Sequence, residues 1–381
     1  MDFDLTTEQK DIQKAALEFA KGEFDPDDAL EYDRNQQFPS KIWKMACELG
    51  FIGLHFPEQY EGQELGLLEN ALAVEAFCRQ DPGIGMALAL SDFGSEMVLR
   101  NGNEDQKKLI LPLIAQGKGM LTMAFLEEDY SLAPLATTAK AGENRYVIDG
   151  KKSFVTLGSL ADYMIVACQT DPDDPHAQSF FLVEREIDGI EISSMGEKVG
   201  MRMIPMDVVS LTGVSVPKEN RLGQEEKGSF QLKDFLNEMR IETAAMGVGI
   251  AQGGLDRALD YGKKREQFGR AIIRFDAIRN KLADMYMEVE LARLITHKAA
   301  WSFDNKKPDN RAILMSKAVA SRAAYRVTYD AVQIYGGLGY MTESHIERFY
   351  RDAKALDFFL EPGQMQKDML ADDMAGNPPR R

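Results

Sequence analysis

Three long helical tracts in the second half of the chain constrain the fold more than any other feature. Sustained apolar stripes predict helices over residues 230–264, 274–301 and 313–335, with Gly269 and Pro308 in the breaks between them. Helices of this length that follow one another closely are typical of a four-helix bundle, and their stripes are expected to pack its core. Because 381 residues exceed one ordinary hydrophobic core, we expect two or three domains.

The hydrophobic pattern changes twice before this bundle. Residues 1–119 have helical periodicity, and Thr6 and Gln9 supply capping chemistry ahead of the first apolar stripe. From residue 120 onward, short β-rich runs alternate with Gly and Asp turns. We therefore predict a mostly α fold with a central β domain. Its parts are an N-terminal helical domain over 1–119, a middle β domain over 120–225 and a C-terminal helical bundle over 226–381.

Charge and composition exclude several function classes. A net charge of −16 disfavours nucleic acid as a partner, because phosphate binding needs a basic surface. No stretch approaches 18 uncharged apolar residues and the N-terminus is polar, so we expect neither a membrane span nor a signal peptide. The three cysteines are far apart, which fits a reducing cytoplasm. The four histidines lack metal-ligand spacing, and we expect no metal site.

The segment from Gln333 to Gln366 carries the most specific pattern. It contains QIYGGLGY, then ER-x-x-RDAK, then a loop that ends in Q-M-Q. By themselves, the glycines fit either a plain interhelical turn or a place where a ligand approaches the backbone closely. The complete string resembles the C-terminal signature of the FAD-dependent acyl-CoA dehydrogenases. The resemblance extends over essentially the whole chain and implies that family's three domains, with a β-barrel or sandwich in the middle and a four-helix bundle at the C-terminus.

The resemblance implies an FAD site divided between subunits. Alone, Arg265 could be a solvated charge at a helix end. In the family, however, the matching R-x-x-F-G segment reaches the pyrophosphate and adenine of FAD held by a neighbouring subunit, so at least a dimer and usually a homotetramer is expected. Phe154 and Thr156 match the family's aromatic-x-Thr beside the flavin ring. The remaining residues assigned to the cofactor are Arg265, Gln267, Phe268, Gln333, Gly336, Gly337 and Gln364.

The expected substrate cavity departs from the family pattern. The family's T-E-P-x-x-G-S-D segment aligns with residues 124–131, where Ala124 replaces the Thr and Tyr130 replaces the Ser. The floor of the cavity should therefore have a different shape. The other residues assigned to the substrate are Met239, Arg240, Phe359 and Leu360.

The catalytic base is also displaced. In most members of the family it is a Glu at a fixed spacing after RDAK, and that place falls on Leu360, one residue before Glu361. Other members keep the Glu immediately before the Arg that matches Arg240, where this chain has Met239. Asp92 lies in an apolar run that corresponds to the wall of the acyl pocket. It could cap a helix starting at Phe93, but with both usual positions vacated we take it as the leading base and Glu361 as the alternative.

The resemblance implies flavin-dependent dehydrogenation of a CoA thioester, in which a carboxylate takes a proton, flavin N5 takes a hydride and an electron-transferring flavoprotein reoxidises the flavin. A relocated base implies proton loss from another carbon. We therefore predict 1,4-elimination on a cyclic substrate such as cyclohex-1-ene-1-carboxyl-CoA, in alicyclic or aromatic acid metabolism. The alternatives are a straight- or branched-chain acyl-CoA dehydrogenase with Glu361 as base, an acyl-CoA oxidase, or a non-catalytic subunit that binds FAD or acyl-CoA.

Overall fold

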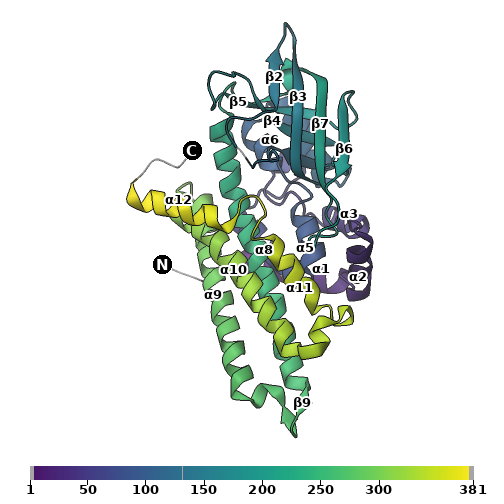
Figure 1. The fold of residues 1–381 in the computed structure, drawn as a ribbon, viewed down its shortest axis with the longest axis vertical. Coiled ribbons are helices and arrows are strands. Elements are labelled where there is room, and N and C mark those ends of the chain that lie inside the picture. The colour runs from purple at the N-terminus through teal and green to yellow at the C-terminus, as the bar shows by residue number, and fades with distance from the viewer. Residues whose placement is uncertain (1–3, 131, 377–381) are drawn as a thin grey trace.

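The computed structural model describes residues 4–130 and 132–376 and arranges them in three parts (Figure 1). A β domain lies at one end of the molecule, a long helical bundle extends away from it, and the N-terminal helices lie against one side of both. The predicted mostly α fold with a central β domain is confirmed. Within the described residues, none of the helices combines the length and the hydropathy that a membrane crossing requires.

The N-terminal part is helical, as the sequence predicts. Thr6 and Gln9 form a capping box at the start of its first helix, in which each side chain accepts a hydrogen bond from the other residue's backbone N–H. A fully buried helix, α5, begins after Asp81, whose carboxylate accepts from the N–H of Ile84 at 3.1 Å. The helices are α1 (Thr7–Glu23), α2 (Pro26–Asn35), α3 (Ser40–Glu48), α4 (Leu67–Gln80), α5 (Pro82–Ala89), α6 (Ser95–Asn101) and α7 (Glu104–Ala115).

The middle part is a mixed sheet with strand order β6-β7-β3-β2-β4-β5-β8, and β1 pairs with β4 in parallel. The long strands β3 and β7 pair antiparallel, and their register shifts between Lys152 and Val155. This bulge contains Phe154, whose φ of 56° lies in the left-handed region. The strands are β1 (Leu121–Ala124), β2 (Thr138–Ala141), β3 (Arg145–Thr156), β4 (Tyr163–Gln169), β5 (Gln178–Glu184), β6 (Ile190–Ser194), β7 (Met206–Pro217) and β8 (Arg221–Leu222).

The C-terminal part is built on α8 (Gly228–Lys264), a helix of 37 residues that is buried over most of its length. Helix α4 crosses it closely at Gly249, where a Cβ atom would come within 2.4 Å of the Glu75 carbonyl oxygen. A short hairpin, β9 (Glu266–Gln267) and β10 (Arg270–Ala271), follows α8. The remaining helices are α9 (Asp276–Asp304), α10 (Asn310–Tyr335), α11 (Ile346–Ala355) and α12 (Gly363–Ala375).

Candidate active site

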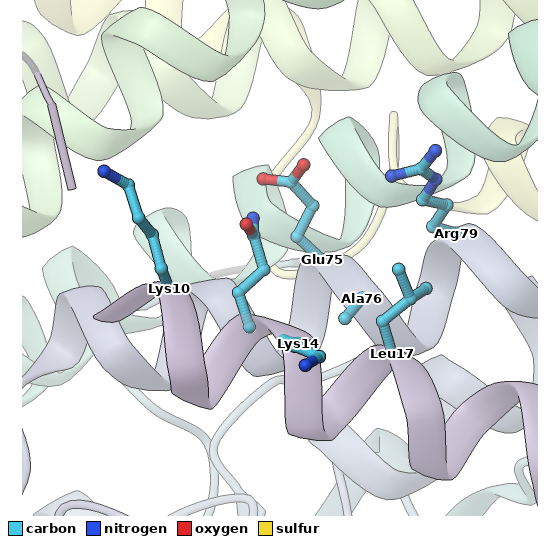
Figure 2. A pocket seen from close by; sticks show the side chains of 7 residues that line it. Lys10, Lys14, Leu17, Glu75, Ala76 and Arg79 are labelled. Carbon is cyan, nitrogen blue, oxygen red and sulfur yellow. The ribbon is translucent and has the colours of Figure 1, made fainter. Parts of the chain in front are cut away.

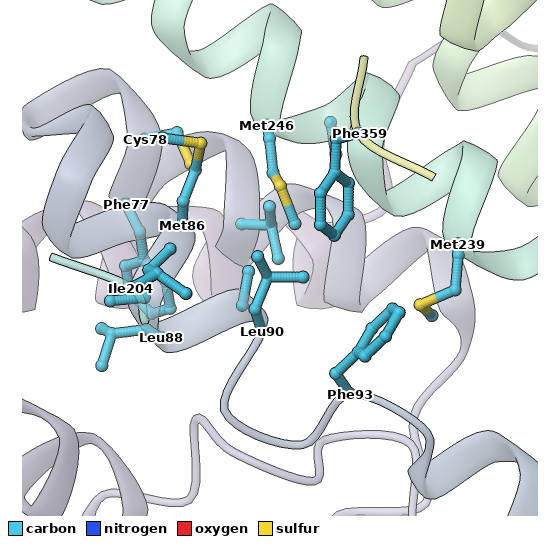
Figure 3. Packing of buried hydrophobic residues seen from close by; sticks show 14 of the residues in the cluster. Phe77, Cys78, Met86, Leu88, Leu90, Phe93, Ile204, Met239, Met246 and Phe359 are labelled. Atoms are coloured by element: carbon cyan, nitrogen blue, oxygen red, sulfur yellow. The ribbon is translucent and has the colours of Figure 1, made fainter. Parts of the chain in front are cut away.

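An apolar cluster lies where the N-terminal helices, the sheet and α8 meet. The ring of Phe93, in the turn after α5, lies 5.4 Å from that of Phe235 on α8 and 6.0 Å from that of Phe359, which precedes α12. Phe125, just after β1, lies 6.4 Å from Phe235. Figure 3 shows Phe93 beside Met239 and Phe359 beside Met246. Segments far apart in the chain thus converge on one aromatic surface.

Both positions at which the family resemblance expects a catalytic Glu belong to this apolar cluster. Met239 on α8 is 2% exposed, and Leu360 is buried beside Phe359. Leu360 has a φ of 64°, a left-handed conformation that is uncommon for a residue with a branched side chain. The chain turns sharply at this residue, and the next side chain, Glu361, pairs with Arg240.

Glu361 is held in a buried ion pair with Arg240. The guanidinium of Arg240 donates from Nε to Oε2 at 2.9 Å and from Nη2 to Oε1 at 2.8 Å, which is the bidentate geometry. Gln366 donates to Oε2 at 2.8 Å, and Lys317 donates to the backbone oxygen of Glu361 at 2.6 Å. Burial lowers the pKa of Lys317 to about 8. Both oxygens of the Glu361 carboxylate are therefore occupied.

Asp92 lies in the turn between α5 and α6. It is not the cap of a helix that starts at Phe93, because α6 begins at Ser95 with Gly94 in the N-cap position. Asp92 instead contributes its backbone oxygen, which accepts from the N–H of Ser95 at 2.8 Å. Burial raises the pKa of the Asp92 carboxyl to about 7, because desolvation disfavours the charged form. A carboxyl group with this pKa can accept a proton near neutral pH.

Residues that the sequence reasoning did not single out surround Asp92. Glu96 on α6 and Glu242 on α8 lie close enough for the charge of Asp92 to raise the pKa of each, in addition to the effect of burial. A signal for these residues is present in their spacing in the sequence. Glu96 follows Asp92 by four residues, and Glu242 follows Glu238 by four. Nothing in the sequence indicates that α6 packs against α8.

The residues assigned to the flavin ring and to the floor of the cavity separate into two groups. Phe154 and Tyr130 stack with their ring centroids 4.7 Å apart. Thr156 is buried at the end of β3, and its backbone oxygen accepts from the hydroxyl of Thr122. Ala124, by contrast, packs in the core of the sheet. The structure therefore places Tyr130 beside Phe154 and moves Ala124 away from that surface.

A buried ion pair fastens the segment that carries Tyr130. Glu127 accepts from Lys152 Nζ at 2.9 Å and from the backbone N–H groups of Ala136 and Thr137 at 2.7 and 2.9 Å. Lys152 is fully buried. Residue 131, the last of the aligned segment, lies outside the described residues.

The residues assigned to the adenosine side of FAD lie at the other end of the molecule (Figure 1). Arg265 and Gln267 are exposed at the β9–β10 hairpin, and Phe268 at its tip is 93% exposed. The ring of Tyr261 near the end of α8 stacks on that of Tyr335 at the end of α10, with centroids 4.2 Å apart. This contact brings the hairpin and the segment with Gln333, Gly336 and Gly337 to the same end of the bundle, where all three are exposed.

Gln364 lies apart from both groups. It is exposed in the first turn of α12 and donates to Asp368 at 3.0 Å. The buried glutamine of this turn is Gln366, which contacts Glu361. The structure thus brings Gln366, and not Gln364, to the ion pair of Glu361 with Arg240.

A small hollow between α1 and α4 is a separate feature (Figure 2). Its volume is about 190 Å³, and most of the side chains that line it are charged or polar, including Lys10, Glu75 and Arg79. Such a lining does not suit an acyl group. We therefore place the candidate site at the aromatic cluster.

Comparison with protein families accounts for each of the three parts. Residues 6–118 match "Acyl-CoA dehydrogenase, N-terminal domain", residues 128–214 match "Acyl-CoA dehydrogenase, middle domain", and residues 226–375 match "Acyl-CoA dehydrogenase, C-terminal domain". The chain belongs to the acyl-CoA dehydrogenase family. It is accordingly an oxidoreductase that uses FAD and acts on acyl thioesters.

Individual relatives in the family align over nearly their full length. A probable acyl-CoA dehydrogenase, YngJ, of Bacillus subtilis is 36% identical over 97% of this chain and 99% of its own. A benzylmalonyl-CoA dehydrogenase of Aromatoleum aromaticum is 34% identical over 93% of this chain and 94% of its own. The FAD complex of PigA superposes with a TM-score of 0.94 at 28% identity, covering 98% of this chain and 99% of PigA.

The exposed end of this acyl-CoA dehydrogenase leaves room for a bound cofactor. The hairpin and the Gly336–Gly337 segment leave open space, since a Cβ added at Gly269, Gly336 or Gly337 would meet no atom within 4 Å. The aromatic side chain at the hairpin tip is almost fully exposed, although burial of such a ring is favourable. Both features suit a surface that another molecule covers.

Proposed function

We propose that this acyl-CoA dehydrogenase acts on a cyclic acyl-CoA, such as cyclohex-1-ene-1-carboxyl-CoA, by 1,4-elimination with Asp92 as the base. The observation that carries the proposal is the buried ion pair between Glu361 and Arg240. It occupies the carboxylate that an ordinary α,β-dehydrogenation would use. Asp92 is then the carboxyl group adjoining the aromatic cluster whose pKa suits proton abstraction near neutral pH.

The ion pair makes Glu361 a poor base for two reasons. Hydrogen bonds from Arg240 and Gln366 occupy both carboxylate oxygens, so neither oxygen is directed at a substrate. Taking up a proton would also leave the buried Arg240 without its counter-ion, which is costly in apolar surroundings. Glu361 therefore serves to hold Arg240 and to anchor the start of α12.

Asp92 adjoins the aromatic cluster through the next residue, Phe93. In an α,β-unsaturated thioester, conjugation acidifies the γ-carbon, so a base that faces this carbon removes its proton. FAD, when bound, accepts the hydride at N5. The chain's own part is to hold the acyl group against the surface formed by Phe93, Phe235 and Phe359 and to present the Asp92 carboxylate.

The aromatic walls favour a ring over a flexible chain. Phe93 meets Phe235 nearly edge to face, at 65°, and Phe359 at a tilt of 53°. Flat and edge-on aromatic surfaces pack well against a planar or half-planar ring. Similarity to a benzylmalonyl-CoA dehydrogenase also supports an acyl group that contains a ring.

The cofactor site is completed by a second subunit. Helix α8 has 37 residues and is therefore about 55 Å long at 1.5 Å per residue. The sheet with Phe154 and Thr156 lies toward its N-terminus, and Arg265 follows its C-terminus (Figure 1). These residues of one chain are too far apart to bind one FAD. We propose a homotetramer built from dimers in the cytoplasm, with an electron-transferring flavoprotein as the electron acceptor.

Product analysis tests the proposal. The purified holoprotein is mixed without oxygen with cyclohex-1-ene-1-carboxyl-CoA, cyclohexanecarboxyl-CoA, butyryl-CoA, isovaleryl-CoA or benzylmalonyl-CoA. Bleaching of the flavin is followed, and products are identified by mass spectrometry and NMR. Fast bleaching with the cyclic enoyl thioester and a conjugated cyclic diene product are expected.

Three outcomes would contradict it. Fast bleaching with butyryl-CoA alone would indicate ordinary α,β-dehydrogenation. Stoichiometric peroxide at full rate in air would indicate an oxidase. Binding of all five thioesters without bleaching would indicate a non-catalytic subunit.

A further inference from the structure

The contact between α6 and α8 buries several carboxyl groups with few cations. Glu96 comes from α6, and Glu238 and Glu242 come from α8, each no more than 5% exposed. Arg100 is bidentate with Glu238, with Nε and Nη2 each 2.6 Å from a carboxylate oxygen. Asp92 lies in the preceding turn, and of these four carboxyl groups Glu238 is the one that hydrogen-bonds to Arg100.

The register of the two helices arranges these groups in order. Arg100 pairs with Glu238, and Gln231 donates to Asn101 at 3.2 Å, so the numbering rises along α6 as it falls along α8. One turn back along α6 from Arg100 is Glu96, and one turn forward along α8 from Glu238 is Glu242. Glu96 and Glu242 therefore face each other on the side nearer to Asp92.

The order continues to the protein surface. Asp234 lies one turn before Glu238 on α8 and is exposed. The side chain of Arg100 is also 44% exposed. Carboxyl groups thus lead from Asp92 through Glu96 and Glu242 to Glu238, whose neighbours are in contact with water.

Burial favours the protonated form of the middle members of this series. Burial, followed by the charge of Asp92, raises the pKa of Glu96 and of Glu242 well above the usual range. Burial also raises the pKa of Glu238, against the opposing effect of Arg100. Neutral carboxyl groups can both donate and accept a proton, which is the property that a relay needs.

The other titratable groups near Asp92 are unsuited to this role. Burial, followed by the charge of Asp92, raises the pKa of the Cys47 thiol to about 12. His55 lies 3.5 Å from Glu96, but burial and the charge of Arg100 lower its pKa to about 4. Oε2 of Glu96 has no hydrogen-bond partner among the residues that the structure describes.

We propose that Glu96, Glu242 and Glu238 conduct the substrate's proton from Asp92 to solvent. This inference rests on the proposed role of Asp92 as base. One proton enters when Asp92 passes it to Glu96. Glu96 and Glu242 each gain one proton and lose another, and Glu238 releases one to water beside Asp234 and Arg100. Asp92 is left ionised for the next turnover, and no electrons move in the relay.

The relay would give the substrate's proton an exit route to solvent. A thioester bound at the aromatic cluster would lie between Asp92 and water, so the proton could not leave by the route that the substrate used. Burial of unpaired carboxyl groups is also costly, because desolvation penalises each one that ionises. A contact between α6 and α8 made of apolar side chains would avoid this cost. A proton path accounts for the retention of the carboxyl groups.

Stopped-flow mixing with a pH-indicator dye tests the relay in the holoprotein. Bleaching of the flavin reports removal of the substrate's hydrogens, and the dye reports release of the proton. In the wild type, both signals should share one rate. In the Glu96→Gln, Glu242→Gln double variant, bleaching should stay within about threefold of the wild type while proton release lags by about tenfold or more. Each single variant should show a smaller lag.

The matched control is Glu75→Gln. Glu75 is also a buried carboxylate in contact with α8, but it pairs with Arg293 at 2.8 Å and lies outside the series. Its proton release should follow bleaching without a lag. A lag in this control as large as in the double variant would assign the effect to general loss of packing and overturn the relay.

Infrared spectroscopy of the protein without flavin gives a second readout. At pH 7 the wild type should show the carbonyl band of protonated carboxylic acids, and Glu96→Gln and Glu242→Gln should each reduce it. An unchanged band in both variants would overturn the relay. So would a proton release that matches bleaching in the double variant, or in both single variants if the double variant does not fold.

The experiment separates this inference from the proposed function. A failure of Asp92 as base appears as normal bleaching in Asp92→Asn. A failure of the relay alone appears as bleaching that depends on Asp92, with proton release unaffected by Glu96 and Glu242.

Discussion

The loop before α12 and the turn between α5 and α6 each place a carboxyl group in apolar surroundings, but they treat its charge differently. Glu361 receives three hydrogen bonds from Arg240 and Gln366. For Asp92, desolvation by burial is the dominant influence and raises the pKa of its carboxyl to about 7. A carboxylate with its own cation stabilises a fold, whereas one that lacks it remains available for chemistry.

Replacing Asp92 tests this comparison most severely. Asp92→Asn keeps the volume of the side chain but cannot accept a proton, so flavin reduction by the substrate should slow by about 10²-fold or more. Flavin content and acyl-CoA binding should be retained. Stopped-flow reduction at saturating substrate measures the effect. A wild-type rate in this variant would show that the base lies elsewhere.

Removing Arg240, the cation that pairs with Glu361, should lower the free energy of unfolding. Arg240→Met leaves the buried Glu361 with an uncompensated charge, and breaking such a pair typically costs about 3–5 kcal/mol. Urea unfolding measures the change. The control is Arg311→Met, which breaks the exposed pair with Asp373 and should cost about 1 kcal/mol or less. Equal losses in the two variants would remove the distinction between the two kinds of ion pair.

The pH dependence of flavin reduction should follow Asp92. With its pKa near 7, the base is protonated in acid. The second-order rate of reduction should therefore fall about tenfold per pH unit below 7 and level off above it. Stopped-flow measurements from pH 5 to 9 test this expectation. A flat profile would contradict it.

The same raised pKa affects folding with a definite sign. The folded state keeps a proton that the unfolded chain loses above a pH of about 4. The contribution of Asp92 to stability is therefore present in acid and is lost as the pH rises through 7. Urea unfolding at several pH values should show a weaker pH dependence for Asp92→Asn than for the wild type.

The smallest effect on the rate of flavin reduction is expected for the variant Glu361→Gln. An amide of the same size can still accept from Arg240, so the rate of flavin reduction should change by less than about threefold. Stability should decrease, because Arg240 loses its counter-ion. An inactive but folded variant would reverse the assignments of the two carboxyl groups.

Much of the helical architecture could be predicted from the sequence, because apolar periodicity is a local property. The tract predicted at 230–264 forms α8, Gly228–Lys264, and the tract at 313–335 lies within α10, Asn310–Tyr335. The parallel pairing of β1 with β4 could not be predicted, because it joins segments about forty residues apart through backbone groups that every residue carries.

The candidate site also has features that the sequence could predict and features that depend on tertiary packing. Vacant base positions at Met239 and Leu360 could be identified by counting residues in the sequence. The clamp on Glu361 could not, since Arg240 lies 121 positions away and contacts it only after α8 and the loop before α12 have packed. Glu96 and Glu242 were missed for the same reason.

The exposed hairpin at Phe268 has a genetic consequence. If each hairpin serves the flavin of a neighbouring subunit, the two functions of one site are encoded on different chains. Arg265→Ala and Asp92→Asn should each abolish activity alone. In a mixed dimer, one site combines both lesions, and the other receives an intact hairpin and an intact Asp92. Coexpression of the two defective genes should therefore restore part of the activity, as intragenic complementation.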